Sequence, residues 1–237
     1  MGISYNPRIV TDGLVLCLDA GNSKSYPGSG TTWSDLSGTG NSGTLTNMDG
    51  TNFNSANGGS LTFDGTDEYV SETSSLSDNF WQGNWTASFW VNFDTLSTTT
   101  SNSNSNSEDK PLLHHGVSGT RTGLHLTQRN TRIHFGLFSD DLQGTKVLST
   151  GTWYNVVFTL NNSTYVKQNY LNGVFDNSHT GGGAYIGTGT NTRIGGKVLT
   201  FGLLFDGFMS SCNFYNRVLT ASEISQNFNA LRGRYGI

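Results

Sequence analysis

The sequence predicts an all-β domain of the two-sheet sandwich type, and three observations support this prediction. Charged residues make up only 13% of the 237 residues, about half the usual ~25%. Polarity comes from Gly, Ser, Thr and Asn instead, and glycine and asparagine supply the positive-φ positions that turns require. Short β-branched and aromatic runs recur between these turn signals. Aromatic residues reach 12%, enough to fill a core and to argue against disorder.

Charge and hydropathy exclude several classes of function. The net charge is −4 and no Lys/Arg run exists, so nucleic-acid binding is not expected. No run approaches the ~18 apolar residues of a membrane span. The first ten residues lack the apolar region of a signal peptide, so assembly in the cytoplasm is expected. Cys17 and Cys212 lie in apolar runs, which favours two buried free thiols, with a disulfide between the two ends of the domain as the alternative.

Residues 58–70 combine apolar strand positions with an acidic turn. The pair Asp64-Gly65 is a tight-turn signal set between the apolar positions. Asp67 and Glu68 follow at once, so three carboxylates crowd one short turn. Such a turn is a candidate metal site, a candidate ligand site or a well-capped corner, and the residues leave these three readings open.

The chain is expected to form one domain over residues 1–237. Residues 85–93 are the strongest strand, with Trp85, Phe89, Val91 and Phe93 facing the core and Trp90 facing the other side. The remaining strand signals lie at residues 14–18, 111–115, 123–126, 132–137, 153–160, 167–175, 194–195 and 205–215. Residues 167–175 are expected to form a hairpin with an Asn-Gly type I′ turn.

Three further segments are expected outside the strands. Residues 1–11 form a lead-in arm, and residues 97–110 form a low-complexity exposed loop rich in Ser, Thr and Asn. Residues 220–231 form a short C-terminal helix that opens on the capping box Thr220-Ala-Ser-Glu223. Ile224, Phe228 and Leu231 line one face of that helix.

Nine motifs in a fixed order carry a family resemblance over about residues 12–228. They are Asp12-Gly-Leu-Val to Asp19, Trp33-x-Asp-Leu-Ser-Gly38, Leu61-x-Phe-Asp-Gly-x-Asp-x-Tyr-Val70, Phe89-Trp-Val91, Trp153-x-x-Val156, Tyr170-x-Asn-Gly173, Ile194-Gly195, Phe205-x-Gly207 and Tyr215-Asn-Arg-x-Leu-Thr-x-x-Glu-Ile224. Together they resemble a concanavalin A-like (laminin-G-like) lectin/glucanase domain. The resemblance implies a jelly-roll sandwich of two antiparallel sheets.

A second, narrower resemblance concerns the two ends of the chain. The Leu-Asp-Ala-Gly-Asn start, the Ser25–Trp33 loop and the end from Asn227 to Ile237 resemble single-domain proteins of tailed phages of aquatic bacteria. This resemblance implies a virion surface protein, such as a capsid decoration, a fibre or a tail adhesin. Its partners would be other virion proteins and further copies of itself.

The family resemblance also implies a calcium site near the acidic turn. Asp64 and Asp67 would supply oxygen ligands, with Asp206 or Asp19 from a second segment and backbone carbonyls completing the roughly six to eight that Ca²⁺ takes. Family members often carry an Asp-Glu pair where this chain has Ser210-Ser211, and this departure weakens the calcium reading.

Catalysis is not expected. Retaining glucanases of this fold place two carboxylates on one strand, about 5–5.5 Å apart. Glutamate occurs here only at positions 68, 72, 108 and 223, and no strand carries the required pair.

Two kinds of binding site remain as candidates. The histidines at 114, 115, 125 and 134 fall on three neighbouring predicted strands. They could form a transition-metal cluster or a pH sensor, or they could be ordinary hydrogen-bonded strand positions. A glycan platform would use an aromatic ring from Trp81, Trp90 or Tyr185, although each tryptophan is also a natural core residue.

These observations predict a non-enzymatic jelly roll that works through its surfaces. The resemblances imply a phage structural protein located in the virion, a decoration or fibre/adhesin subunit with host glycans as a candidate ligand. The alternative is a free carbohydrate-binding lectin module, with a glycoside hydrolase as a more distant one.

Overall fold

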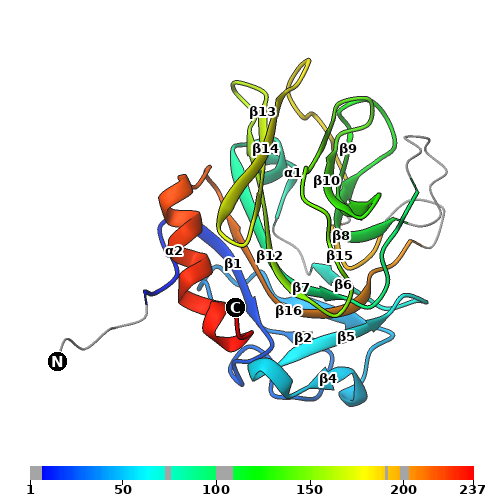
Figure 1. Cartoon of the computed structure of the whole chain (residues 1–237), viewed down its shortest axis with the longest axis vertical. Helices are drawn as coiled ribbons and strands as arrows, with labels where there is room; N and C mark the ends of the chain where they lie inside the picture. The colour runs from blue at the N-terminus through cyan, green and yellow to red at the C-terminus, as the bar shows by residue number, and fades with distance from the viewer. Residues whose placement is uncertain (1–6, 73–75, 100–108, 190–191, 198–202) are drawn as a thin grey trace.

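The strands of the computed structural model form two antiparallel sheets that pack face to face as a jelly-roll sandwich (Figure 1). The structure describes residues 7–72, 76–99, 109–189, 192–197 and 203–237. Sheet A contains, in spatial order, β14 (Val174–Thr180), β13 (Val166–Leu171), β12 (Trp153–Asn161), β7 (Trp85–Phe93), β16 (Asp206–Tyr215), β5 (Ser60–Asp64) and β4 (Phe53–Asn54), with β1 (Leu14–Asp19) also paired to β16. Sheet B contains β11 (Asp141–Gln143), β10 (Arg132–Gly136), β9 (Gly123–Arg129), β8 (Lys110–Gly116), β15 (Arg193–Ile194), β6 (Tyr69–Glu72), β3 (Gly43–Thr46) and β2 (Thr32–Trp33).

Few helical residues accompany the sheets. In the part of the chain that the structure describes, the helices are α1 (Asp78–Trp81) and α2 (Ala221–Leu231), with 3₁₀ turns at Gly50–Asn52, Ala56–Gly58 and Arg232–Arg234. Within the described residues, no helix has the length and apolar character needed to cross a membrane.

The core lies between the two sheets and is rich in aromatic rings. Phe89 and Phe158 on sheet A lie with ring centroids 6.4 Å apart, and Phe158 meets Phe135 of sheet B at 5.9 Å. The predicted alternation along residues 85–93 is confirmed. The odd-numbered residues of this strand enter the core, whereas Trp90 belongs to a separate cluster. The aromatic residues therefore fill the sandwich as the sequence predicts.

The helix α2 covers the outer face of sheet A (Figure 1). Its predicted capping box is present: the Thr220 hydroxyl accepts from the Glu223 N–H, and the Glu223 carboxylate accepts from the Thr220 N–H. Trp90 is stacked between Tyr235 at 4.0 Å and Phe228 at 5.7 Å. The outward-facing tryptophan is thus buried by the C-terminal segment.

The predicted hairpin at residues 167–175 is also confirmed. Asn172 and Gly173 both have positive φ, 52° and 74°, as a type I′ turn requires. A Cβ atom at position 173 would lie 2.9 Å from the Phe228 side chain. The glycine is therefore needed both for the turn and for close packing against α2.

The expectation that residues 97–110 form an exposed loop is wrong at both ends of the segment. The ends of the 97–110 segment are not exposed: Ser97 is buried and exchanges hydrogen bonds with the Gln128 amide, and Asp109 is buried against Arg129. Residues 100–108 of that loop and residues 1–6 of the lead-in arm lie outside the described residues. Both cysteines are free and buried, as expected.

The cluster around Trp90 makes the first prediction. Trp90→Ala should lower the free energy of unfolding by about 3–5 kcal/mol, because it removes the ring between Tyr235 and Phe228 and leaves a cavity. Chemical denaturation measures the change, with Val147→Ala, at a position 62% exposed, as the control that should stay within about 0.5 kcal/mol. A loss under about 1 kcal/mol at Trp90 would contradict the role assigned to this cluster.

Candidate functional site

The acidic turn of residues 58–70 is a structural corner. The Glu68 carboxylate is buried and accepts hydrogen bonds from the Asp64 N–H at 2.7 Å and from the Asn52 side-chain amide at 2.6 Å. Asp64 Oδ1 accepts from the Thr66 N–H at 2.8 Å. Burial raises the pKa of the Glu68 carboxyl. Glu68 and Asp64 therefore hold the backbone of the turn, which is the third of the readings left open by the sequence.

The structure does not gather the carboxylates proposed for calcium into one site. Asp64 and Asp206 are register partners on β5 and β16, and Asp206 accepts a hydrogen bond from the Thr95 hydroxyl. Within the described part of the chain, no set of three ligand side chains includes Asp64, Asp67 or Asp206. Asp19, the alternative ligand, is paired with Arg234 at 3.0 Å. Calcium binding that depends on backbone oxygens stays a prediction.

The three aromatic residues proposed as a glycan platform are all buried. Trp81 is 0% exposed, and Trp90 and Tyr185 are each 1% exposed. The Tyr185 hydroxyl contacts His115 Nδ1 at 2.9 Å, and Trp81 stacks on the His115 ring. Stacking on a sugar needs an accessible ring face, so this expectation is corrected: in this structure none of the three rings presents one.

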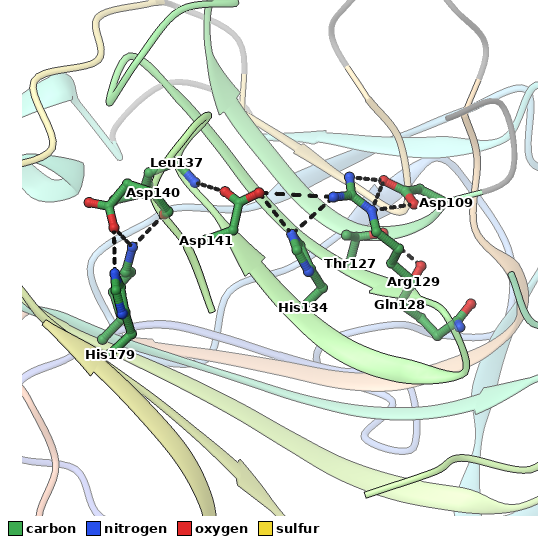
Figure 2. A network of polar contacts seen from close by, with 10 residues as sticks. Asp109, Thr127, Gln128, Arg129, His134, Leu137, Asp140, Asp141 and His179 are labelled. Carbon is green, nitrogen blue, oxygen red and sulfur yellow. Dashed lines mark hydrogen bonds and ion pairs between the residues drawn. The ribbon is translucent and has the colours of Figure 1, made fainter. Parts of the chain in front are cut away.

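A buried polar network lies instead on the face of sheet B that is turned away from the core. Along β9 and β10, Leu124, Leu126, Ile133 and Phe135 enter the core, so the alternate positions carry the network outward. Arg129 on β9 holds Asp109 through two nitrogens, Nε at 2.9 Å and Nη2 at 2.6 Å. Its third nitrogen, Nη1, lies 3.2 Å from His134 Nε2 on β10 (Figure 2).

Asp140, the last residue before β11, and Asp141, its first residue, extend the network in opposite directions, as Figure 2 shows. Asp141 Oδ2 lies 3.4 Å from His134 Nε2, and Asp141 Oδ1 accepts from the Leu137 N–H at 3.1 Å. Burial alone would raise the pKa of Asp141, but the contact with His134 and the nearby His125 hold it well below its ordinary value.

Asp140 is directed to the other side, toward sheet A. Its Oδ1 lies 2.6 Å from Lys167 Nζ on β13 and 3.1 Å from His179 Nε2 on β14. Lys167 is fully buried and also donates to the Asp140 carbonyl. Burial lowers the pKa of the Lys167 ammonium, and the Asp140 carboxylate opposes that change. The pair joins the two sheets at one end of the sandwich.

A polar pocket of about 430 Å³ opens at this end. Asp140 contributes a buried carboxylate whose Oδ2 has no hydrogen-bond partner. A Cβ at Gly181 would lie 2.2 Å from that oxygen, so only glycine leaves room for it there. The lining side chains are polar or absent; they are those of Thr120, Arg121, Ser139, Asp140, His179, Thr180, Gly181 and Gly182. The pocket suits a ligand rich in hydroxyl groups.

The backbone around the pocket is unusually strained. Arg121 and Ser139, two lining residues, have φ of 60° and 62° although neither is glycine. Their neighbour Phe138 (φ 51°) and Tyr165 (φ 62°), whose carbonyl accepts from the Gly181 N–H, share this conformation. Such residues persist where the surrounding structure fixes them, and they cluster at functional sites.

The residues of this end were not singled out in the sequence. The pair Asp140-Asp141 and the isolated charged residues Arg121 and Lys167 form no local pattern that predicts their convergence. Of the four histidines, His115 stacks on the core residue Trp81. Of the predicted histidine cluster, the structure brings His125 and His134 together, with their rings 5.7 Å apart.

Comparison with known families identifies the fold and the family. The sequence profile of the concanavalin A-like lectin/glucanases superfamily matches residues 64–225, and the chain belongs to this superfamily. A comparison with curated proteins finds no match.

Solved structures agree on the fold. Domain 4 of the extracellular GH43 arabinanase AbnA from Geobacillus stearothermophilus, solved with arabinotriose, aligns with a TM-score of 0.64 at 19% identity, over 90% of this chain and 97% of that one. Trypanosoma rangeli sialidase aligns with a TM-score of 0.63 at 20% identity, over 94% of this chain but 33% of the sialidase. The binding domain of Paraclostridial Mosquitocidal Protein 1 aligns with a TM-score of 0.62 at 15% identity, over 93% of this chain and 52% of that one. This chain therefore spans the whole arabinanase domain but about a third of the sialidase.

Histidine burial on sheet B makes the second prediction. His114 is fully buried and neither ring nitrogen has a hydrogen-bond partner. Burial, followed by the positive charges nearby, lowers the pKa of His114 to about 3. As the pH falls through about 6.5, His114 takes up a proton in the unfolded chain but not in the folded chain. The free energy of unfolding therefore decreases as the pH is lowered below that value. Between pH 7 and pH 5 this residue should cost about 2 kcal/mol of unfolding free energy.

Denaturation at several pH values measures this loss. His114→Leu should lose about 2 kcal/mol less than the unsubstituted protein over the same range. Val147→Ala, at an exposed position without a titratable side chain, is the control and should keep the full pH dependence. Equal slopes in all three proteins would show that His114 does not resist protonation.

Proposed function

We propose that this protein is a non-enzymatic carbohydrate-binding domain whose ligand occupies the polar pocket beside Asp140. The observation that carries the proposal is a pocket in which the buried residue Asp140 is accompanied by hydroxyl groups, the Arg121 guanidinium, the His179 imidazole and two glycines. Sugar hydroxyls donate to a carboxylate and accept from guanidinium, imidazole and backbone N–H groups. Fold likeness supports the proposal as well, since the arabinanase domain was solved with arabinotriose.

The pocket favours binding over hydrolysis. Asp140 is the single carboxylic acid among its lining residues, whereas most glycoside hydrolases flank the bond with two. Asp140 Oδ1 is moreover occupied by Lys167 Nζ at 2.6 Å and by His179 Nε2 at 3.1 Å, so this oxygen is not free to act on a bound sugar. Arabinan, sialosides and β-glucan should therefore release no reducing sugar when incubated with the protein.

Glycan binding makes the third prediction. Arg121→Ala should weaken binding about tenfold to a hundredfold, the effect of losing one charge-assisted hydrogen bond, and His179→Ala should weaken it about threefold to tenfold, the effect of losing one ordinary hydrogen bond. Both side chains line the pocket and neither belongs to the core clusters, so both variants should fold. Glycan-array screening followed by calorimetry with the best oligosaccharide measures the change. Lys24→Ala, an exposed lysine outside the pocket, is the matched control.

Two results would contradict this assignment. An array with no bound glycan would remove carbohydrate as the ligand. Binding that is unchanged in both pocket variants would move the site elsewhere on the protein.

A finer proposal concerns location: we infer that the domain is part of a tailed-phage virion, as a decoration or fibre/adhesin subunit that contacts capsid or tail proteins and copies of itself. The resemblance of the two ends of the chain to phage surface proteins supports this proposal. Charged residues make up only 13% of the chain, and Ser, Asn, Thr and Gly are abundant. This composition favours water-mediated, hydrogen-bonded contacts over association guided by charge.

The virion proposal makes the fourth prediction. The purified protein should form an oligomer of defined size in light scattering coupled to gel filtration, and it should co-sediment with phage particles that carry it. A strictly monomeric protein that is absent from particles would favour the free lectin module instead. Glycan binding by such a monomer would leave the carbohydrate proposal intact.

A further inference from the structure

Two histidines and an aspartate converge on the outer face of sheet B, next to the pocket but outside it. Ligand atoms of His125 on β9, His134 on β10 and Asp141 on β11 all lie within 4.8 Å of one another. Neither histidine nor Asp141 lines the pocket, so this cluster is independent of the proposed glycan site. Both histidines are buried, while the Asp141 side chain is 25% exposed.

The hydrogen bonds of His134 cannot be completed by the described side chains alone. Arg129 only donates, so its Nη1 at 3.2 Å requires a lone pair on His134 Nε2. The same nitrogen faces Asp141 Oδ2 at 3.4 Å, and an ionised carboxylate only accepts. With the lone pair on Nε2, two acceptors face each other; with a proton there, Arg129 and His134 face each other as donors. Either tautomer leaves one of the two contacts mismatched.

A small cation between His134 and Asp141 removes the mismatch. A tetrahedral ion with ligands at 2.0–2.1 Å holds them about 3.3 Å apart. The observed 3.4 Å between Nε2 and Oδ2 already has this value. The Arg129 cation fills this role only in part, since its ion pair with Asp141 is long, at 4.0 Å from Nη1, and its other nitrogens are held by Asp109.

The sequence around His125 leaves space for its ring to reach this point. His125 and Gly136 are register partners, and a Cβ at position 136 would lie 1.8 Å from His125 Nε2. The ring can lie flat against β10, nearly parallel to the His134 ring at 23°, only because residue 136 is glycine. His125 Nδ1 and His134 Nδ1 are buried without hydrogen-bond partners. The Leu137 N–H fixes the Asp141 carboxylate, as a second-shell donor does at metal sites.

We propose that His125, His134 and Asp141 bind a divalent transition-metal ion, with zinc as the best match. Two imidazoles and one carboxylate are a common zinc donor set, and hard ions such as Ca²⁺ and Mg²⁺ prefer oxygen alone. The ion takes the place of Arg129 Nη1 at His134 Nε2, and water enters from the exposed side of Asp141 to complete the coordination. The bound ion would link the three neighbouring strands β9, β10 and β11.

Metal titration makes the fifth prediction and tests this site. After dialysis against a chelator, Zn²⁺ should raise the melting temperature, and Co²⁺ should give the intense visible bands of a tetrahedral nitrogen and oxygen site. Asp141→Asn keeps the shape and the acceptor for the Leu137 N–H but removes the charge. This variant and His134→Gln should weaken Co²⁺ binding at least about tenfold. His179→Gln, which changes a histidine outside the cluster, should bind Co²⁺ like the unsubstituted protein.

Several results would overturn the proposal. They are the absence of a Co²⁺ spectrum in the unsubstituted protein, equal binding by Asp141→Asn and the unsubstituted protein, and loss of binding only in His179→Gln. A parallel Ca²⁺ titration, with Asp64→Ala as its variant, separately tests the calcium prediction at the acidic turn. Glycan binding by a protein that binds no metal would contradict this proposal and leave the carbohydrate proposal untouched.

Discussion

The ion pair between Lys167 and Asp140 is the interaction on which this end of the molecule depends. A fully buried ammonium is costly unless a carboxylate compensates it, and removing one partner of such a pair typically costs about 3–5 kcal/mol. Lys167 belongs to sheet A and Asp140 to the loop between β10 and β11 of sheet B. The pair therefore fixes how that loop leaves sheet B, including the left-handed backbone at Phe138 and Ser139.

Asp140 is held toward sheet A, and its neighbour Asp141, the first residue of β11, points the opposite way (Figure 2). This dipeptide therefore supplies one carboxylate to the pocket and another to the network of Arg129 and His134. Glycines complete both sites: Gly181 leaves space for the Asp140 carboxylate, and Gly136 leaves space for the His125 ring. The two proposed sites thus share a backbone segment but no ligand side chain.

The sequence predicts the fold much better than the site, for a physical reason. Strand signals such as residues 85–93, the turn Asn172-Gly173 and the cap at Thr220 depend on local periodicity and local hydrogen bonds, and all three are confirmed. The role of Trp90 depends on the C-terminal segment that covers it, which no local pattern shows.

The sites depend on long-range pairing. Lys167 meets Asp140 only because the two sheets pack, and His125 meets His134 only through the register of β9 and β10. Acidic residues close in sequence, at 64 to 68, proved to hold a corner, since nearby carboxylates most readily bind their own backbone. Proximity along the chain therefore does not predict the sites, because the residues that converge in space come from different strands and loops.

The central claim is that ligand recognition belongs to the loop end around Asp140 and not to the aromatic face under α2. Backbone amide chemical shifts, followed by NMR while a bound oligosaccharide is titrated, test it most directly. The account predicts the largest shifts at Thr120, Arg121, Ser139, Asp140 and residues 179–182, with residues near Trp90 and Tyr235 unchanged. Shifts centred on the Trp90 and Tyr235 cluster, with the loop end unperturbed, would contradict it.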